Sequence, residues 1–340
     1  GRGCWAEVRQ TVYFVPGLEL HRSRGKKSGQ AAFSRSVRTR IGKLPALPQT
    51  LLVKEGDTLI LTRSDAMGQP ATYNRSGQIL TPAQIGVSLP QILDHASAGD
   101  PVWFDDGKIG GVIRAVNPDS VSVEITQARP EGERLGAEKG INLPETQIDI
   151  PALTTDDLEA LKFVVQHADL VGYSFVRTGS DIHQLLERLA ELGGQHLGLI
   201  LKIETQKAFE NLPELILAAM RVRTFGIMIA RGDLAVECGY QRLAEVQEEV
   251  LWICEAAHVP VIWATQVLES LAKKGIPSRS EITDAAMGER AECVMLNKGP
   301  YAVTSVRVLA DILKRMQAHQ EKKSSMLRKL NLATAFRNTA

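Results

Sequence analysis

Short runs of alternating or β-branched residues occupy roughly the first 150 positions of the chain. Gly, Pro, Asp and Asn separate these runs, which is the pattern of short strands joined by tight turns. The runs cover residues 11–15, 49–53, 58–62, 102–104, 111–116 and 120–125. We therefore predict a small all-β domain, placed at residues 1–143.

A second pattern begins near residue 150, where nearly continuous apolar runs alternate with helical periodicity. Continuous apolar runs are typical of parallel strands covered on both faces. The predicted strands are 169–175, 197–203, 225–230, 260–264 and 293–296, and the predicted helices are 156–167, 181–192, 207–220, 241–258, 280–290 and 303–320. Thr154 and Thr155 precede Asp156 and Asp157, which predicts an N-cap and an acidic first turn.

The strand-helix units repeat about every thirty residues, which indicates either a βα barrel or a doubly wound sheet. Polar residues at the end of each predicted strand favour the barrel, because strand ends converge there on one mouth. These residues are Ser174, Lys202, Glu204, Arg231, Asp233, Thr265, Asn297 and Lys298. We predict an α/β fold with a barrel portion at 144–320 and a tail at 321–340. A complete barrel needs eight strands, so either three precede Gly1 or the sheet closes differently.

Composition narrows the class of protein. The chain is 44% hydrophobic and 23% charged, as in globular proteins, and no apolar run approaches the roughly 18 residues of a membrane span. We expect no membrane partner.

The spacing of Cys4, Cys238, Cys254 and Cys293 predicts neither zinc binding nor disulfides, so a reducing cytoplasm is expected. The chain opens with Gly1 rather than Met, and we interpret it as starting inside a longer protein.

Positive charge is concentrated at the start of the chain. Residues 1–54 hold eleven Lys and Arg against two acidic residues, although the whole chain has a net charge of +1. Such a cluster can bind phosphates or nucleic acid. No aromatic residues are interleaved with it for base stacking. We interpret it as a solvated basic segment and expect no nucleic-acid partner.

Two carboxylates and a lysine form the first chemical pattern. Lys202 and Glu204 are separated by one residue of a predicted strand and so point to the same side. Asp233 follows the next strand, 29 residues after Glu204. Carboxylates from neighbouring strand ends can share one hard divalent cation, with magnesium favoured. The alternative is a structural ion pair between Lys202 and Glu204.

Backbone and hydroxyl groups supply the second pattern. We expect Gly232 to let the chain turn tightly between Arg231 and Asp233, which exposes N–H groups to an anion. Thr265 also begins where a strand ends, so its hydroxyl can bind an anion, relay a proton or cap the next helix. Metal, lysine and anion-binding backbone together suit phosphoryl transfer or elimination on a phosphorylated carboxylate. The chain has no Walker A or G-x-G-x-x-G loop to hold a nucleotide.

Several collinear motifs resemble the pyruvate kinase family over residues 50–315. They are LILKIE (199–204), GIMIARGDLAVE (226–237), PVIWATQVLESL (260–271), PSRSEITDAA (277–286), VWFDDGKI (102–109), LGAEKGINLP (135–144), IDIPALTTDDLEALKF (148–163) and SFVRTGSDI (174–182). The resemblance implies a (β/α)8 TIM barrel, incomplete here, with the small all-β domain inserted as a lid. It also implies phosphoryl transfer from phosphoenolpyruvate to ADP, giving pyruvate and ATP in glycolysis.

The resemblance also implies roles for individual residues. Lys202 would contact the transferring phosphoryl group, and Glu204 and Asp233 would hold Mg²⁺ or Mn²⁺. The backbone of Arg231, Gly232 and Asp233, with the Thr265 hydroxyl, would bind the substrate carboxylate. Thr265 or a nearby water would protonate enolpyruvate. On the lid, the residues that would face nucleotide are Asp106, Lys139 and Asn142.

The chain departs from the family pattern in three places. The first barrel strands have no counterpart, so the ligands of a K⁺ ion that the family implies are not in this chain. The last strand ends in Asn297-Lys298-Gly299 where the family has serine, glycine and glutamate. No C-terminal α/β domain follows, which makes regulation by sugar phosphates doubtful and leaves the oligomeric state open, with a homo-oligomer as one option.

Two other functions compete with the kinase hypothesis. A metal-dependent lyase or aldolase acting on pyruvate would use the same two carboxylates, although it would have no need of a nucleotide lid. A pyruvate kinase-like protein that has lost catalysis and only binds ligands is the other, with the altered Asn297-Lys298 segment as its mark.

Overall fold

The computed structural model describes residues 17–22, 37–43, 50–64 and 67–320. The chain divides into two compact units, Gly1–Gln49 and Thr50–Ala340. In the first unit, β1 (Glu19–Arg22) pairs antiparallel with β2 (Val37–Arg40). Cys4, the predicted strand 11–15, part of the basic segment and the tail 321–340 lie outside the described residues.

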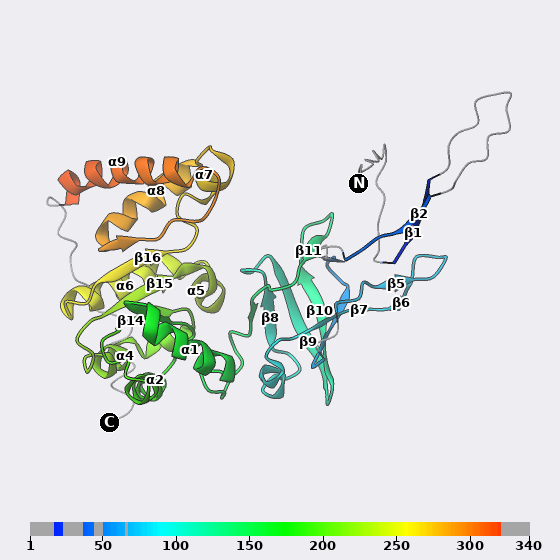
Figure 1. The fold of residues 1–340 in the computed structure, drawn as a ribbon, viewed down its shortest axis with the longest axis horizontal. Coiled ribbons are helices and arrows are strands. Elements are labelled where there is room, and N and C mark those ends of the chain that lie inside the picture. The colour runs from blue at the N-terminus through cyan, green and yellow to red at the C-terminus, as the bar shows by residue number, and fades with distance from the viewer. Residues whose placement is uncertain (1–16, 23–36, 44–49, 65–66, 321–340) are drawn as a thin grey trace. The chain divides into compact units, whose positions relative to one another are not determined.

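The second unit begins with the strands of the predicted β domain (Figure 1). A six-stranded sheet has the order β12-β8-β9-β10-β4-β7, and two smaller pairs are β3 with β11 and β5 with β6. The strands are β3 (Leu51–Val53), β4 (Thr58–Thr62), β5 (Thr72–Tyr73), β6 (Ile79–Thr81), β7 (Ala83–Gly86), β8 (Pro101–Phe104), β9 (Ile109–Asn117), β10 (Ser120–Gln127), β11 (Glu133–Leu135) and β12 (Ile141–Asn142), with a 3-10 turn at Pro90–Asp94.

Alternation along these strands builds the core of the sheet. Leu59 and Leu61 of β4, and Val121, Val123 and Ile125 of β10, are buried while their neighbours are partly exposed. The five predicted strands between residues 49 and 125 are confirmed. The other five strands have two to four residues each, too few to give a readable period.

Five parallel strands follow in the order of the chain, joined by helices. They are β13 (Leu170–Tyr173), β14 (Gly198–Ile203), β15 (Phe225–Ala230), β16 (Val261–Ala264) and β17 (Cys293–Val294). All five predicted strands are confirmed, and the α/β fold corresponds to part of a TIM-type barrel. In β14, Leu199, Leu201 and Ile203 are buried in the core shared with the helices, while Ile200 and Lys202 occupy the other, half-exposed face.

All six predicted helices are found in the described residues, one of them divided in two, and α5 and α7 are additional. The helices are α1 (Thr155–His167), α2 (Gly179–Glu191), α3 (Gln206–Glu210), α4 (Leu212–Ala219), α5 (Arg231–Cys238), α6 (Leu243–Ala256), α7 (Glu269–Lys274), α8 (Arg279–Met287) and α9 (Ala302–Gln320), with a 3-10 turn at Gly288–Arg290. Thr154 caps α1 through a capping box with Asp157, as predicted.

Two differences concern helix boundaries. The single helix predicted at 207–220 is two helices, because Pro213 lies at the start of α4 and cannot donate a backbone hydrogen bond to a preceding turn. The helix α5 begins directly at the end of β15, where we predicted a tight turn at Gly232. In the part of the chain that the structure describes, no helix has both the length and the apolar character to cross a membrane.

The segment after β17 packs against α7. The Tyr301 N–H donates to the carbonyl oxygen of Ala272 at 3.1 Å, and a Cβ at Gly299 would overlap the Ala272 backbone, with its carbonyl carbon only 2.6 Å away. Glycine at this departure from the family pattern therefore allows a close approach of two backbones.

Changing Gly299 to alanine is expected to lower the free energy of unfolding by about 2 kcal/mol, because α7 must shift to admit the methyl group. Gly136→Ala is the matched control, since its Cβ would meet only ordinary contacts at 3.8 and 3.9 Å. Urea unfolding followed by circular dichroism measures both. Equal stability of the two variants would contradict this packing.

Candidate active site

The end of β14 carries the predicted lysine and carboxylate. Lys202 Nζ lies 2.7 Å from Glu204 Oε1 and 2.7 Å from Ser174 Oγ. The other carboxylate oxygen, Glu204 Oε2, accepts the Phe175 N–H at 2.6 Å. The predicted placement of Lys202 and Glu204 on one side is confirmed. The Phe175 N–H was not foreseen, since nothing in the sequence indicates the left-handed backbone, φ 52°, that it adopts.

This ion pair is largely withdrawn from water. The Glu204 side chain is 3% exposed and that of Lys202 is 26% exposed. Burial raises the pKa of the Glu204 carboxyl above its ordinary value, against the opposing effects of Lys202 and the Phe175 N–H. The charge of Asp233 raises the same pKa further, because this second carboxylate lies close enough to interact electrostatically with the pair.

Asp233 lies in the first turn of α5. Burial raises the pKa of its carboxyl, the nearby charge of Asp106 adds to the increase, and Asn142 and Lys202 oppose it. Lys202, Glu204 and Asp233 thus share one electrostatic environment. Two buried carboxylates that repel each other are hard oxygen ligands whose charge a divalent cation would neutralise, so they fit such an ion. Among the described residues, no group of three or more His, Cys, Asp and Glu side chains is placed to hold a metal.

Asn142 connects the β domain to α5. Its Nδ2 donates to Asp233 Oδ1 at 3.3 Å and to Glu237 Oε1 at 3.2 Å. The residue is 3% exposed, and its Oδ1 is a buried acceptor without a hydrogen-bond partner. Sequence reasoning did not single out Glu237. Glu237 lies one helical turn after Asp233, which would have indicated that the two side chains share a helix face. This pattern was not recognised because α5 itself was not predicted.

Arg231 and Gly232 differ from the expectation. Gly232 is not in a tight turn, because it has helical backbone in the first turn of α5 and no left-handed φ. Its N–H donates to Thr265 Oγ1 at 2.9 Å. The Arg231 side chain is buried and donates to the carbonyl oxygens of Ala264 and Thr265 and to the Asp284 carboxylate. Arg231, Gly232 and Asp233 therefore lie in the first turn of a helix and not in the predicted glycine turn.

Thr265 follows β16 with a left-handed backbone, φ 64°, and Gln266 continues it at φ 58°. Thr265 does not cap α7, because Leu268 is the N-cap residue and makes no side-chain cap. We predicted that the Thr265 hydroxyl binds an anion, relays a proton or caps the next helix, and the capping role is wrong. Because Oγ1 accepts the Gly232 N–H, the hydroxyl proton remains for donation.

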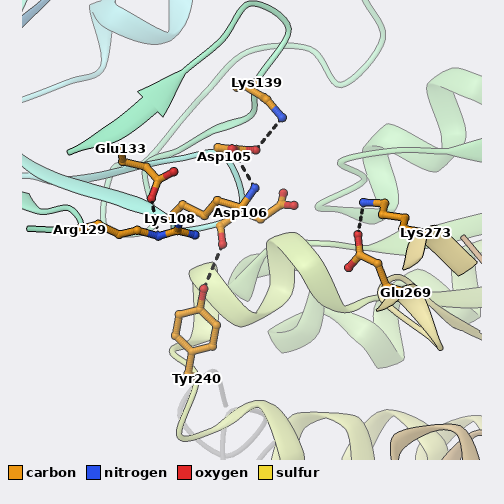
Figure 2. A network of polar contacts seen from close by, with 9 residues as sticks. All are labelled: Asp105, Asp106, Lys108, Arg129, Glu133, Lys139, Tyr240, Glu269 and Lys273. Atoms are coloured by element: carbon orange, nitrogen blue, oxygen red, sulfur yellow. Dashed lines mark hydrogen bonds and ion pairs between the residues drawn. The ribbon is translucent and has the colours of Figure 1, made fainter. Parts of the chain in front are cut away.

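The turn between β8 and β9 holds Asp106, and Lys139 reaches this turn from the segment between β11 and β12 (Figure 2). Asp105 pairs with Lys108 and Lys139, each at 2.9 Å, and these two lysines outweigh burial and lower the pKa of its carboxyl. The Tyr240 hydroxyl donates to the Asp106 carbonyl oxygen at 3.0 Å. Gly107, at φ 79°, lies against Tyr240, and a Cβ there would come 2.5 Å from the hydroxyl. The turn between β8 and β9 therefore packs against the segment that follows α5.

Comparison with known proteins identifies the family. The family model "Pyruvate kinase, barrel domain" matches residues 30–306. Similar curated proteins include pyruvate kinase PKLR of Rattus norvegicus, 34% identical over 69% of this chain and 40% of the relative. Pyruvate kinase of Geobacillus stearothermophilus is 31% identical over 78% and 43%. Pyruvate kinase of Thermococcus litoralis is 32% identical over 84% and 56%.

The chain thus spans about half the length of the curated relatives it matches. The match covers both the β-domain strands and the five strand-helix units, including the ends of β14, β15 and β16 where the site residues lie. The chain belongs to the pyruvate kinase family.

Proposed function

We propose that the protein transfers the phosphoryl group of phosphoenolpyruvate to ADP. The bond between phosphorus and the enol oxygen breaks, a β-phosphate oxygen of ADP forms the new bond, and the enolate takes a proton at carbon to give pyruvate. The observation that carries this proposal is the half-buried Lys202 ammonium, 2.7 Å from both Glu204 and Ser174 at the end of β14.

Lys202 supplies the positive charge that this reaction needs. The phosphoryl group in flight carries negative charge on its equatorial oxygens, and protein catalysis consists mainly of positioning and of stabilising that charge. Ser174 and Glu204 hold the ammonium in one place, so little reorganisation is needed when charge develops. The side chain keeps 26% exposure, which leaves it open to a substrate.

Glu204 and Asp233 would hold Mg²⁺ or Mn²⁺. When bound, the ion neutralises phosphoryl and carboxylate oxygens and polarises the substrate. Lys202 meanwhile keeps the Glu204 carboxylate oriented. The N–H groups of the first turn of α5 lie at a helix N-terminus, which attracts anions. The backbone of this turn, at Arg231, Gly232 and Asp233, would bind the substrate carboxylate together with the Thr265 hydroxyl, to which the Gly232 N–H donates.

Thr265 is the proposed proton donor or relay toward the enolate carbon, directly or through water. Its hydroxyl oxygen already accepts the Gly232 N–H at 2.9 Å, so the hydroxyl points its proton away from the helix. On the β domain, Asp106, Lys139 and Asn142 are the proposed nucleotide side. A K⁺ requirement, a homo-oligomer and a cytoplasmic location remain predictions from the sequence.

Oxalate, a mimic of enolpyruvate, tests the metal-dependent part of this proposal. Titration calorimetry of the chain is expected to show oxalate binding with Mn²⁺ present and an affinity at least about 100-fold weaker after EDTA, because the carboxylates alone repel the ligand. Equal oxalate affinity with and without metal would contradict the metal-bridged site.

Turnover distinguishes the competing functions. Pyruvate formation from phosphoenolpyruvate that requires both ADP and Mg²⁺ supports the kinase. Pyruvate formed by carbon–carbon cleavage without ADP would identify a lyase or aldolase instead. Metal-dependent oxalate binding without any turnover would identify a protein that binds ligands and has lost catalysis.

A further inference from the structure

Arg231 is a buried cation held entirely by protein groups. Its Nε donates to the Ala264 carbonyl oxygen at 2.7 Å, its Nη2 donates to the Thr265 carbonyl oxygen, and both terminal nitrogens contact the Asp284 carboxylate, Nη2 at 3.0 Å from Oδ2. The guanidinium carbon also lies 4.6 Å from the centre of the Trp263 ring. A buried charge of this kind is tolerated only when it is paired, and Asp284 provides the pairing.

The two carbonyl groups that Arg231 binds lie at the start of a strained segment, in Ala264 at the end of β16 and in Thr265. Thr265, Gln266 and Leu268 have φ angles of 64°, 58° and 47°, and left-handed backbone is unfavourable for residues other than glycine. Such strain persists only where surrounding contacts determine the backbone. The paired hydrogen bonds from one rigid guanidinium to consecutive carbonyl groups are contacts of that kind.

The same contacts join the two strand ends of the site. The Arg231 side chain reaches from α5 to the backbone after β16, and the next residue, Gly232, donates its N–H to Thr265 Oγ1 at 2.9 Å. Asp233 follows immediately. A shift of the guanidinium would therefore move the Thr265 hydroxyl relative to the N–H groups beside Asp233.

We infer that Asp284 is a positioning residue of the active site. From α8, 53 residues away in sequence, its carboxylate fixes the Arg231 guanidinium, which in turn holds the strained backbone that aims the Thr265 hydroxyl. In this role Asp284 acts through the Arg231 side chain and the Thr265 backbone. The inference rests on the proposed function only in assigning Thr265 to the substrate carboxylate.

Asp284→Asn tests the inference, and Glu248→Gln is its control. Glu248 forms an ion pair with Arg290 at an exposure similar to that of Asp284, 29% against 28%, but that pair makes no contact with Thr265. A purely structural role for Asp284 would make both variants lose melting temperature and nothing else. Asp284→Glu keeps the charge and serves as the rescue variant.

The first readout is Mn²⁺-dependent oxalate affinity. Asp284→Asn is expected to weaken it about 10- to 100-fold, since misplacing a positioned group by about 1 Å can cost that much. Glu248→Gln is expected to stay within twofold of wild type, and Asp284→Glu to recover part of the loss. Oxalate affinity unchanged in Asp284→Asn would overturn the inference, whereas absence of oxalate binding in the wild type would count against the proposed function instead.

The second readout does not depend on a ligand. Hydrogen–deuterium exchange of a peptide covering residues 264–268 is expected to accelerate at least about tenfold in Asp284→Asn, because the loop loses the guanidinium that holds it. Peptides from β14 serve as the internal reference. Unchanged exchange at 264–268 in a folded Asp284→Asn protein would overturn the inference, whatever the protein binds.

Discussion

Replacing Lys202 with methionine is expected to lower turnover of phosphoenolpyruvate by about 10³-fold or more. Methionine keeps the unbranched apolar stem of the side chain but lacks the terminal ammonium that is proposed to face the transferring phosphoryl group. Loss of one preorganised stabilising group typically costs about 10²–10³ in rate. The loss here is expected at the upper end, because Lys202 also fixes the Glu204 carboxylate at 2.7 Å.

The coupled assay for pyruvate measures this effect, and Lys162→Met is the control. Lys162 pairs with Glu159 at the same distance of 2.7 Å but on the exposed surface of α1. Its replacement is expected to leave turnover within twofold of wild type. The melting temperature of Lys202→Met shows that the protein has folded. Turnover within tenfold of wild type in the folded Lys202→Met protein would remove Lys202 from the mechanism.

The fold of the second half of the chain could be predicted because its strands lie in nearly continuous apolar runs. Leu199 to Ile203 form such a run, interrupted by Lys202, and runs of this kind are typical of parallel strands. The same alternation that buries Leu199, Leu201 and Ile203 places Lys202 on the opposite face. Local sequence therefore contained both the strand and the proximity of Lys202 to Glu204.

Contacts between distant segments could not be predicted in this way. Arg231 and Asp284 are paired across 53 residues, and neither residue carries a local signal of its partner. The left-handed backbone at Thr265 has no glycine to indicate it. Gly232 was misleading, because glycine suggests a turn whereas the apolar residues Leu234, Ala235 and Val236 pack into the core and favour a helix that begins at once.

The contacts of Asn142, in the β domain, could likewise not be predicted from the sequence. Its motif predicted a place at the exit from the β domain, but the two-residue strand β12 is too short to reveal which way its side chain points. The structure turns it toward Asp233 and Glu237. Its proposed contact with nucleotide must therefore coexist with a contact to the carboxylates of α5.

Neutralising either proposed metal ligand, by Glu204→Gln or Asp233→Asn, is expected to weaken Mn²⁺ binding about 100-fold, because an amide oxygen lacks the charge that attracts a hard cation. Folding should survive. Burial raises the pKa of both carboxyls, because it disfavours their ionised forms. Without metal, Asp233→Asn is expected to keep the melting temperature of the wild type, whereas Glu204→Gln is expected to lower it because Lys202 loses its charged partner. In both variants the increase produced by Mn²⁺ is expected to disappear.

Glu237→Gln separates this ligand pair from its surroundings. Glu237 shares the Asn142 amide with Asp233, and burial raises the pKa of its carboxyl too, yet it lies one helical turn further from the end of β15. Mn²⁺ affinity, measured by calorimetry, is expected to stay within threefold of wild type in this variant. Mn²⁺ affinity could instead fall as much in Glu237→Gln as in Asp233→Asn and stay unchanged in Glu204→Gln. That result would place the cation between Asp233 and Glu237, beside Asn142, and not between Asp233 and Glu204, beside Lys202. The phosphoryl group and the metal would then lack a common centre, and the mechanism proposed for Lys202 would fail with it.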